Sequence, residues 1–401
     1  MNVLFVCHRV PFPPKRGGKI RPFNIIRHLR SQGHRVTVAS LARSDAELEE
    51  SRGLADHCAR TLVEVVPDYL AWPRMVARLP TTAPSSFGYF YSPQLARRLK
   101  ADIAQTRYDL VFVHCSSVAP YVERVHGPAK ILDYGDIDSQ KWREYSVHRA
   151  LPMSAGYWLE AVKLERRELS LSRSFDLCTC TTRAELESLR KFGVTTASDW
   201  FPNGVDAKAF APDATAYDPD TICFIGRMDY FPNQQAVTSF VRDVFPLLRQ
   251  RREGAKLLVV GADPPDFIRK LGEVPGVTVT GSVPQVQPYV LRSALTIAPL
   301  EIARGTQNKI LESMAMGVPV VCSPQAAGGV DIVPGEHALV ASTPAEWLDA
   351  ILGLMGSRER REQVAQAARA RVLSNHSWPA SMARLDGLIE QVLHNRRRAA
   401  G

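Results

Sequence analysis

The sequence predicts an α/β protein with two doubly wound parallel-sheet domains. Short apolar runs alternate with longer helical ones along the chain, which is typical of parallel βαβ units. The alternation starts again after the residues WFPNGVD, close to residue 200. A chain of 401 residues is also too long for one ordinary core. We therefore expect domains at residues 1–198 and 199–375, and a helix at residues 376–401 that packs back on the first domain.

In the first half, apolar runs predict strands at Val3 to Cys7, Val36 to Ser40, Leu62 to Val66, Leu110 to His114, Lys130 to Asp133 and Leu177 to Thr181. Helical spacing predicts helices from Lys19 to Gln32 and from Trp158 to Ser172. Residues 67–93 are rich in proline and aromatic residues and predict an insertion. An amphipathic element around Trp72, with two arginines, would either pack on the core or anchor the protein at a membrane interface.

In the second half, strands are predicted at Thr221 to Ile225, Lys256 to Val260, Val277 to Thr280, Leu295 to Ala298 and Val318 to Cys322. Apolar residues repeat at helical spacing between Leu385 and Val392, which predicts a helix from Ser377 to Arg398. The arginines near its end complement the negative pole of the helix dipole.

The composition is that of a soluble globular protein, with 45% apolar and 23% charged residues. No apolar run reaches the roughly 18 residues that cross a bilayer. The chain opens directly on a strand-like run without a signal-peptide cleavage site, so we expect a cytoplasmic protein. The seven cysteines form no CxxC motif and sit mostly in apolar runs, which predicts reduced core residues.

The net charge of +9 is unevenly distributed, because residues 1–35 hold eight Lys or Arg and no acid. Such a face suits an acidic membrane surface, a phosphorylated acceptor or nucleic acid, and it is equally typical of a solvated basic helix. No helix-turn-helix, zinc-finger or RNP motif accompanies the charge, so nucleic acid is not expected. We expect the basic first domain to meet the anionic inner face of the cytoplasmic membrane.

The stretch RGTQNKILESMAMGVPVV predicts a helix start that can hold an anion. Gly305 and Thr306 leave backbone N–H groups free where the helix dipole favours negative charge. Lys309 and Glu312 are three residues apart and share one face of the helix. A surface salt bridge on an ordinary helix is the alternative interpretation.

Two more loops point to phosphate binding, because ligands of open α/β sheets bind beyond the carboxyl ends of the strands. Gly17 and Gly18 precede a helix and allow a tight turn with close backbone approach, although a plain turn would also use glycine. They do not form a GxGxxG motif, which disfavours a dinucleotide cofactor. Arg227, at the end of a predicted strand, would converge with Lys309 on one diphosphate and neutralise it without a metal ion.

Two strand ends in the first half carry further candidates. KILDYGDIDS places Asp133, Asp136 and Asp138 together, as metal ligands, general bases or partners of an acceptor hydroxyl, or equally as helix N-caps. DLVFVHCSS leaves His114 at a strand end, either as a catalytic group or as a structural residue.

Together these residues resemble the retaining glycosyltransferases of family 4, whose GT-B fold has two Rossmann-like domains facing across a cleft. The resemblance covers nearly the whole chain, through the Gly17-Gly18 loop, LRSQGHRVTV, PNGVD, FIGRM and KILESMAMGVPVV. Within the family, DYGDIDS, YFPN and RGTQNKILE are most similar to sugar transferases found with exopolysaccharide and PEP-CTERM sorting systems.

The resemblance implies transfer of a hexosyl group from a nucleotide diphosphate sugar to a glycan or polyprenyl-linked acceptor, with retained configuration and no metal cofactor. Arg227 and Lys309 would bind the diphosphate and act in catalysis with Asp136, and Glu312 would bind the ribose. The implied donor site also includes Gly17, Gly18, Gly305, Thr306, Gln307 and Asn308, and the acceptor side includes His114, Asp133 and Asp138.

The chain departs from the family pattern at three places. Arg304 stands where the family has the first of two glutamates, and Pro232 and Asn233 stand where a lysine is usual. Gly135, next to Asp136, stands where a histidine is common. Arg304 and Lys309 restore the positive charge, but the missing glutamate leaves two alternatives open: a nucleotide-sugar epimerase of the same fold, and a non-catalytic nucleotide-sugar-binding protein.

Overall fold

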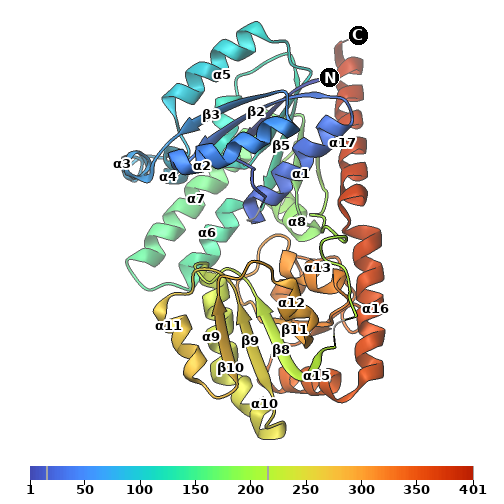
Figure 1. Ribbon diagram of the computed structural model, residues 1–401. Helices are drawn as coiled ribbons and strands as arrows, with labels where there is room; N and C mark the ends of the chain where they lie inside the picture. Colours follow the sequence, from blue (N-terminus) through green and yellow to red (C-terminus); the bar gives the residue numbers. More distant parts are fainter. Residues whose placement is uncertain (15–16, 215, 401) are drawn as a thin grey trace. The chain divides into compact units, whose positions relative to one another are not determined.

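The computed structural model describes residues 1–14, 17–214 and 216–400, and contacts divide the chain into two compact units (Figure 1). The first unit contains residues 1–201 and the chain from Met382 onward, and the second unit contains Pro202–Ser381. The division therefore falls three residues beyond the expected 198/199 boundary, and the chain returns to the first unit six residues later than expected.

The first unit is built on a parallel sheet in the order β3-β2-β1-β4-β5-β6-β7. Its strands are β1 (Asn2–Cys7), β2 (Arg35–Ala42), β3 (Arg60–Val65), β4 (Leu110–His114), β5 (Ala129–Gly135), β6 (Leu177–Cys180) and β7 (Ser198–Trp200). β4 and β5 are buried along their whole length, as expected for parallel strands covered on both faces. Leu4 of β1 pairs with Thr37 of β2 on one side and with Val111 of β4 on the other. β1 therefore lies between β2 and β4, and the chain crosses over the sheet to reach β4.

The helices of this unit are α1 (Gly17–Ser31), α2 (Asp45–Glu50), α3 (Asp68–Val76), α4 (Ser85–Tyr89), α5 (Pro93–Gln105), α6 (Asp138–Val147), α7 (Met153–Ser172) and α8 (Arg183–Lys191). Side-chain N-caps begin three of them, since Ser44 accepts a hydrogen bond from Glu47 N, Ser92 from Leu95 N and Thr182 from Glu185 N. The proline- and aromatic-rich insertion forms α3 and α4. α7 begins five residues before the helix predicted at Trp158.

The second unit has a parallel sheet in the order β10-β9-β8-β11-β12-β13. Its strands are β8 (Asp218–Ile225), β9 (Lys256–Val260), β10 (Val277–Gly281), β11 (Ser293–Ala298), β12 (Val320–Cys322) and β13 (Leu339–Val340). Its helices are α9 (Phe231–Asp243), α10 (Phe245–Arg251), α11 (Asp266–Arg269), α12 (Gln287–Leu291), α13 (Asn308–Ala315), α14 (Pro324–Ala327), α15 (Pro344–Gly356) and α16 (Arg358–Asn375). Gly317, in the left-handed region at φ +69°, follows α13 and turns the chain into β12.

The last helix, α17 (Trp378–Ala400), is fastened to the first unit by three charged contacts. Asp386 faces His28 at 2.8 Å, Arg384 faces Asp199 at 2.8 Å, and Arg396 faces Asp176 at 3.0 Å. Among the described helices, none has both the length and the apolar content that a membrane crossing requires. All seven cysteines are buried and unpaired.

A buried ion pair joins α1 to the carboxyl end of β5. Arg21 Nε donates to Asp133 Oδ2 at 2.9 Å and Nη2 donates to Oδ1 at 2.8 Å, with side chains only 2% and 0% exposed. Nη1 of Arg21 donates to the carbonyl of Phe201 at 3.0 Å, and the guanidinium lies over the Phe201 ring. Thr179 Oγ1 and the His114 ring complete the contacts of the carboxylate, at 2.9 and 2.7 Å. Every polar atom of Asp133 is therefore satisfied inside the unit.

This arrangement controls the ionisation of Asp133. Burial alone would raise its pKa, but the charge of Arg21 and the hydrogen bonds from Arg21 and His114 lower the pKa below its ordinary range. The stabilisation is therefore present above about pH 4, the ordinary pKa of an aspartate, and is lost as the pH falls through the lowered value.

We expect Asp133→Asn to lower the free energy of unfolding of the first unit by about 3 to 5 kcal/mol, because it leaves the Arg21 charge buried without a counter-charge. Urea unfolding followed by tryptophan fluorescence would measure the loss. The matched control is Asp199→Asn, which removes the surface pair with Arg384, with side chains 39% and 41% exposed, and should cost about 1 kcal/mol or less. Equal losses in the two variants would contradict a special role for the buried pair.

Candidate functional site

The start of α13 carries buried polar atoms that the described residues leave without hydrogen bonds. Thr306 Oγ1 and Asn308 Oδ1 are both of this kind. Gly305 precedes them at φ +64°, a conformation that favours glycine. Gln307, the N-cap residue, does not cap the helix with its side chain, because its Nε2 donates back to the Arg304 carbonyl at 3.1 Å. Since buried polar groups normally find partners, these atoms point to a ligand at the helix start.

The Lys309 ammonium lies at the carboxyl end of β8. Its Nζ donates to Asn233 Oδ1 at 2.6 Å and lies 4.6 Å from the centre of the Phe224 ring. A Cβ on Gly226 would stand 3.0 Å from the same Nζ, so glycine leaves the room that Lys309 uses. Burial lowers the pKa of Lys309 to about 7, although the Glu312 charge acts in the opposite direction.

Glu312 shares this face of α13 with Lys309. Burial raises the pKa of its carboxyl to about 7, and the Lys309 charge opposes the rise. The described residues offer the Glu312 side chain no hydrogen bond, so its oxygens are available as acceptors. Two half-buried groups with pKa values shifted toward each other are typical of functional sites.

Arg227 follows β8 as expected, but its guanidinium is already paired. Nε and Nη2 bind Asp229 at 3.0 and 2.7 Å, and Nη2 also binds Asp263 at 2.5 Å. Among the described residues, Nη1 of Arg227 makes no hydrogen bond, and the expected binding of a diphosphate by Arg227 stays a prediction. The two cations are nevertheless linked, since Asn233 Nδ2 donates to the Arg227 carbonyl at 2.7 Å while its Oδ1 holds Lys309.

Asn233 is a site residue that the sequence analysis named only as a departure from the family pattern, without giving it a role. It stands at the position where the family usually has a lysine, and it is 6% exposed. The signal was present in the motif YFPN, but the spacing alone did not show that Asn233 and Lys309, 76 residues apart, would meet.

Gly17 and Gly18 lie in the first turn of α1 and are exposed. Gly18 is not in the left-handed region, and the expected tight turn before the helix stays a prediction. A Cβ on Gly18 would meet no atom within 4 Å, so the space above this helix start is open. The neighbouring Lys15 and Arg16 lie outside the described residues.

In the first unit, the structure separates the roles of the acidic candidates. Asp133 is fully buried and engaged, which corrects its expected place on the acceptor side. Asp136, at the end of β5, is half-buried and accepts a hydrogen bond from Thr181 Oγ1 at 3.1 Å. Asp138 lies in the first turn of α6, where burial raises the pKa of its carboxyl and Lys141 opposes the rise. α6 has no side-chain N-cap, so neither carboxylate serves in that way.

His114 is oriented by the buried carboxylate. Its Nδ1 lies 2.7 Å from Asp133 Oδ2, and because a carboxylate only accepts hydrogen bonds, Nδ1 is the donor in this contact and Nε2 is left for another partner. Gly135, at φ +67°, has no side chain, and a Cβ there would come within 3.2 Å of the His114 Cε1. The imidazole of His114 thus occupies space next to the position where the family often has a histidine.

The basic stretch at residues 1–35 is not one exposed face, which corrects the sequence interpretation. Arg21 is buried against Asp133, and Lys19 is 6% exposed and bound to Glu47 at 2.7 Å. Arg27 donates to Asn24 at 2.8 Å. Among the described residues, no group of three or more His, Cys, Asp or Glu side chains is placed to hold a metal ion.

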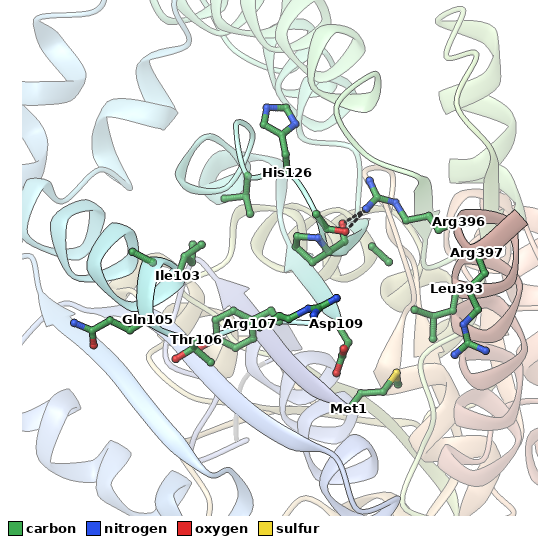
Figure 2. A pocket seen from close by; sticks show the side chains of 16 residues that line it. Met1, Ile103, Gln105, Thr106, Arg107, Asp109, His126, Leu393, Arg396 and Arg397 are labelled. Atoms are coloured by element: carbon green, nitrogen blue, oxygen red, sulfur yellow. Dashed lines mark hydrogen bonds between the residues drawn. The ribbon is translucent and has the colours of Figure 1, made fainter. Parts of the chain in front are cut away.

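A cavity of about 920 Å³ opens at the opposite end of the first sheet, between the amino ends of its strands and α17 (Figure 2). Met1, Asp109 and Ala129 line it beside Arg397 and Arg396, whose Nη1 donates to the carbonyls of Gly127 and Pro128. Because α/β sheets bind ligands at the carboxyl ends of their strands, this cavity is not the site built around His114.

Comparison with known proteins assigns the two halves of the chain to related families. A model described as Glycosyltransferase Family 4 matches residues 16–209, and one described as Glycosyl transferases group 1 matches residues 219–357. A curated relative, glycosyltransferase 1 domain-containing protein 1 of Xenopus tropicalis, is 26% identical over 145 residues, which is 35% of this chain. The match spans only 42% of that relative's length.

Solved structures share the whole fold at low sequence identity. Sucrose-phosphate synthase from Thermosynechococcus elongatus is 15% identical with a TM-score of 0.74, covering 98% of this chain and 100% of its own. HepE of Anabaena, solved with UDP, is 14% identical with a TM-score of 0.69, also over 98% and 100%. TarM is 11% identical with a TM-score of 0.72, over 96% and 98%. The fold is therefore GT-B, and each half of the chain matches the model of a glycosyltransferase family.

Proposed function

We propose that the protein is a retaining glycosyltransferase that moves a hexosyl group from a nucleoside diphosphate sugar to a glycan or polyprenyl-linked acceptor. The observation that carries the proposal is the start of α13, where the unsatisfied atoms of Thr306 and Asn308 lie beside the desolvated Lys309. HepE, a similar fold, was solved with UDP and with UDP-glucose, which makes a uridine nucleotide the first donor to test. The similarity of DYGDIDS and RGTQNKILE to PEP-CTERM-associated transferases supports a role in exopolysaccharide assembly at the inner face of the membrane.

In this proposal the second unit binds the leaving group. Backbone N–H groups at the start of α13 and the Lys309 ammonium bind the diphosphate, and Glu312 accepts hydrogen bonds from the ribose hydroxyls. Arg227 joins through Nη1, or exchanges an aspartate partner for a phosphate oxygen. A bound diphosphate would restore the charge of Lys309, whose pKa burial now lowers to about 7.

The first unit supplies the acceptor side. Asp136 and the Nε2 of His114 lie near the carboxyl ends of β5 and β4, where an acceptor hydroxyl can be held. The bond between the sugar and the diphosphate breaks, the acceptor oxygen bonds to the same face of the anomeric carbon, and the hydroxyl proton passes to a donor phosphate oxygen. The diphosphate leaves with that proton, and no covalent enzyme intermediate is required.

We expect Lys309→Met and Arg227→Ala each to lower transfer at least tenfold, or about 1.4 kcal/mol of transition-state stabilisation, because each removes a cation from the leaving diphosphate. Turnover of UDP-sugar with a lipid-linked acceptor would be compared by radiolabel transfer. The matched control is Lys256→Met, an exposed lysine paired with Asp218 at 2.9 Å, which should retain full activity. Unchanged turnover in both site variants would remove the diphosphate site from the proposal.

The affinity for UDP should fall as the pH rises from 7.5 to 9, by up to about tenfold per pH unit. Only protonated Lys309 attracts the ionised diphosphate, and above a pKa of about 7 the free enzyme must take up this proton when UDP binds. The terminal phosphate of UDP, with a pKa of about 6, is already ionised over this range. Calorimetric titration would measure the slope, and Lys309→Met should bind weakly with no slope. A slope that survives in Lys309→Met would assign it to another group.

We expect transfer to persist in excess chelator, because two cations and the helix dipole supply the positive charge that a metal ion would otherwise provide. The assay is radiolabel transfer after dialysis against EDTA. Complete loss that manganese or magnesium restores would instead make Asp136 and Asp138 metal ligands.

Donor hydrolysis or epimerisation without transfer, or donor binding without turnover, would favour the two alternatives that the missing first glutamate leaves open.

A further inference from the structure

Exposed apolar side chains concentrate in one part of the first unit. Of the seventeen large apolar side chains that are exposed among the described residues, ten lie in residues 69–79 and 147–159. They include Trp72 and Trp158, both 53% exposed, and Leu151, 79% exposed. We call these two segments the apolar surface. An apolar concentration of this kind typically marks an interaction site.

The two segments are held together by buried polar contacts. Lys163 Nζ, on α7, donates to the carbonyl of Leu79 at 2.8 Å. The Glu160 carboxylate, one turn earlier, accepts hydrogen bonds from Ser85 N and Ser86 N at 2.9 and 2.8 Å and so binds the start of α4. α3 and α4 pack closely, and Figure 1 shows both beside α7. The end of residues 69–79 is therefore joined to α7 within two turns of Trp158 and Leu159.

The charges around the apolar surface are mainly positive. Residues 69–79 and 147–159 contain Arg74, Arg78 and Arg149 and no acid, and of the acids that flank them Glu160 is buried and Glu144 is half-buried. Asp68 accepts the Tyr89 hydroxyl at 2.7 Å and is thus already used inside the unit. Tryptophan, tyrosine and arginine side chains are common at the level of the lipid headgroups. There the aromatic rings contact apolar groups and the arginine cations contact phosphate.

We propose that the apolar surface docks the protein on an anionic lipid bilayer, with Trp72 and Trp158 inserted at the headgroup level. Charge complementarity favours this occupant, because the surface offers cations and almost no acids. The basic stretch at residues 1–35 does not serve instead, since its Lys19 and Arg21 are buried and paired. The proposal rests on the proposed function only in that a polyprenyl-linked acceptor would be reached from such a surface.

Co-sedimentation with vesicles tests the proposal without any transfer reaction. The purified full chain is mixed with vesicles of equal parts phosphatidylglycerol and phosphatidylcholine, and with vesicles of phosphatidylcholine alone. We expect binding to the anionic vesicles, and an at least tenfold weaker partition coefficient for the double variant Trp72→Ser/Trp158→Ser. The matched control is Phe267→Ser in the second unit, a residue 52% exposed, which should bind as the wild type does.

Three results would overturn the proposal: undiminished binding of the double variant, equal binding of the wild type to neutral vesicles, or loss of self-association in the double variant with lipid binding intact. The last would assign the surface to a second copy of the chain. A thermal-shift measurement with UDP separates the two hypotheses. Failure of UDP to stabilise the wild type would count against the proposed function, whereas the double variant should keep whatever shift the wild type shows.

Discussion

The first unit is organised around one buried carboxylate. Asp133 receives hydrogen bonds from α1 through Arg21, from β4 through His114 and from β6 through Thr179, and Arg21 also holds the carbonyl of Phe201. A charge taken out of water in this way is tolerable only when all its acceptor positions are filled. The same requirement makes Nδ1 of His114 the hydrogen-bond donor. The contacts of Asp133 therefore both join α1 to the sheet and orient the His114 ring.

The start of α13 in the second unit differs, because some of its buried polar atoms have no hydrogen-bond partner among the described residues. Each unsatisfied buried polar group costs about 1 to 3 kcal/mol, and the start of α13 leaves two of them beside a lysine that burial pushes toward neutrality. A fold keeps such a cost where a ligand later supplies the missing partners. In the proposed function, a bound diphosphate would supply the hydrogen-bond partners that Thr306 and Asn308 lack in the described part of the chain.

The sequence predicted the features that depend on local pattern. Buried parallel strands are continuous apolar runs, so β1, β4 and β8 were found, whereas β7 and β13, with three and two residues, are too short to show a pattern. Roles set by distant partners were missed. Asp133 was one of three similar aspartates until Arg21, 112 residues away, was seen to bind it. The second aspartate that binds Arg227, Asp263, lies 36 residues further along the chain and was likewise not expected.

The charge and hydrophobicity of a sequence segment did not predict which of its side chains are exposed, for related reasons. The basic stretch looked like a binding face because a sequence shows where charges lie along the chain and not which are buried, as Arg21 is. Apolar residues are assigned to the core by default, yet the first turns of α7 expose Met153, Trp158 and Leu159. Exposed apolar area costs about 25 cal/mol per Å² relative to its burial. In the proposed docking, the lipid surface would cover Trp158 and recover part of this free energy.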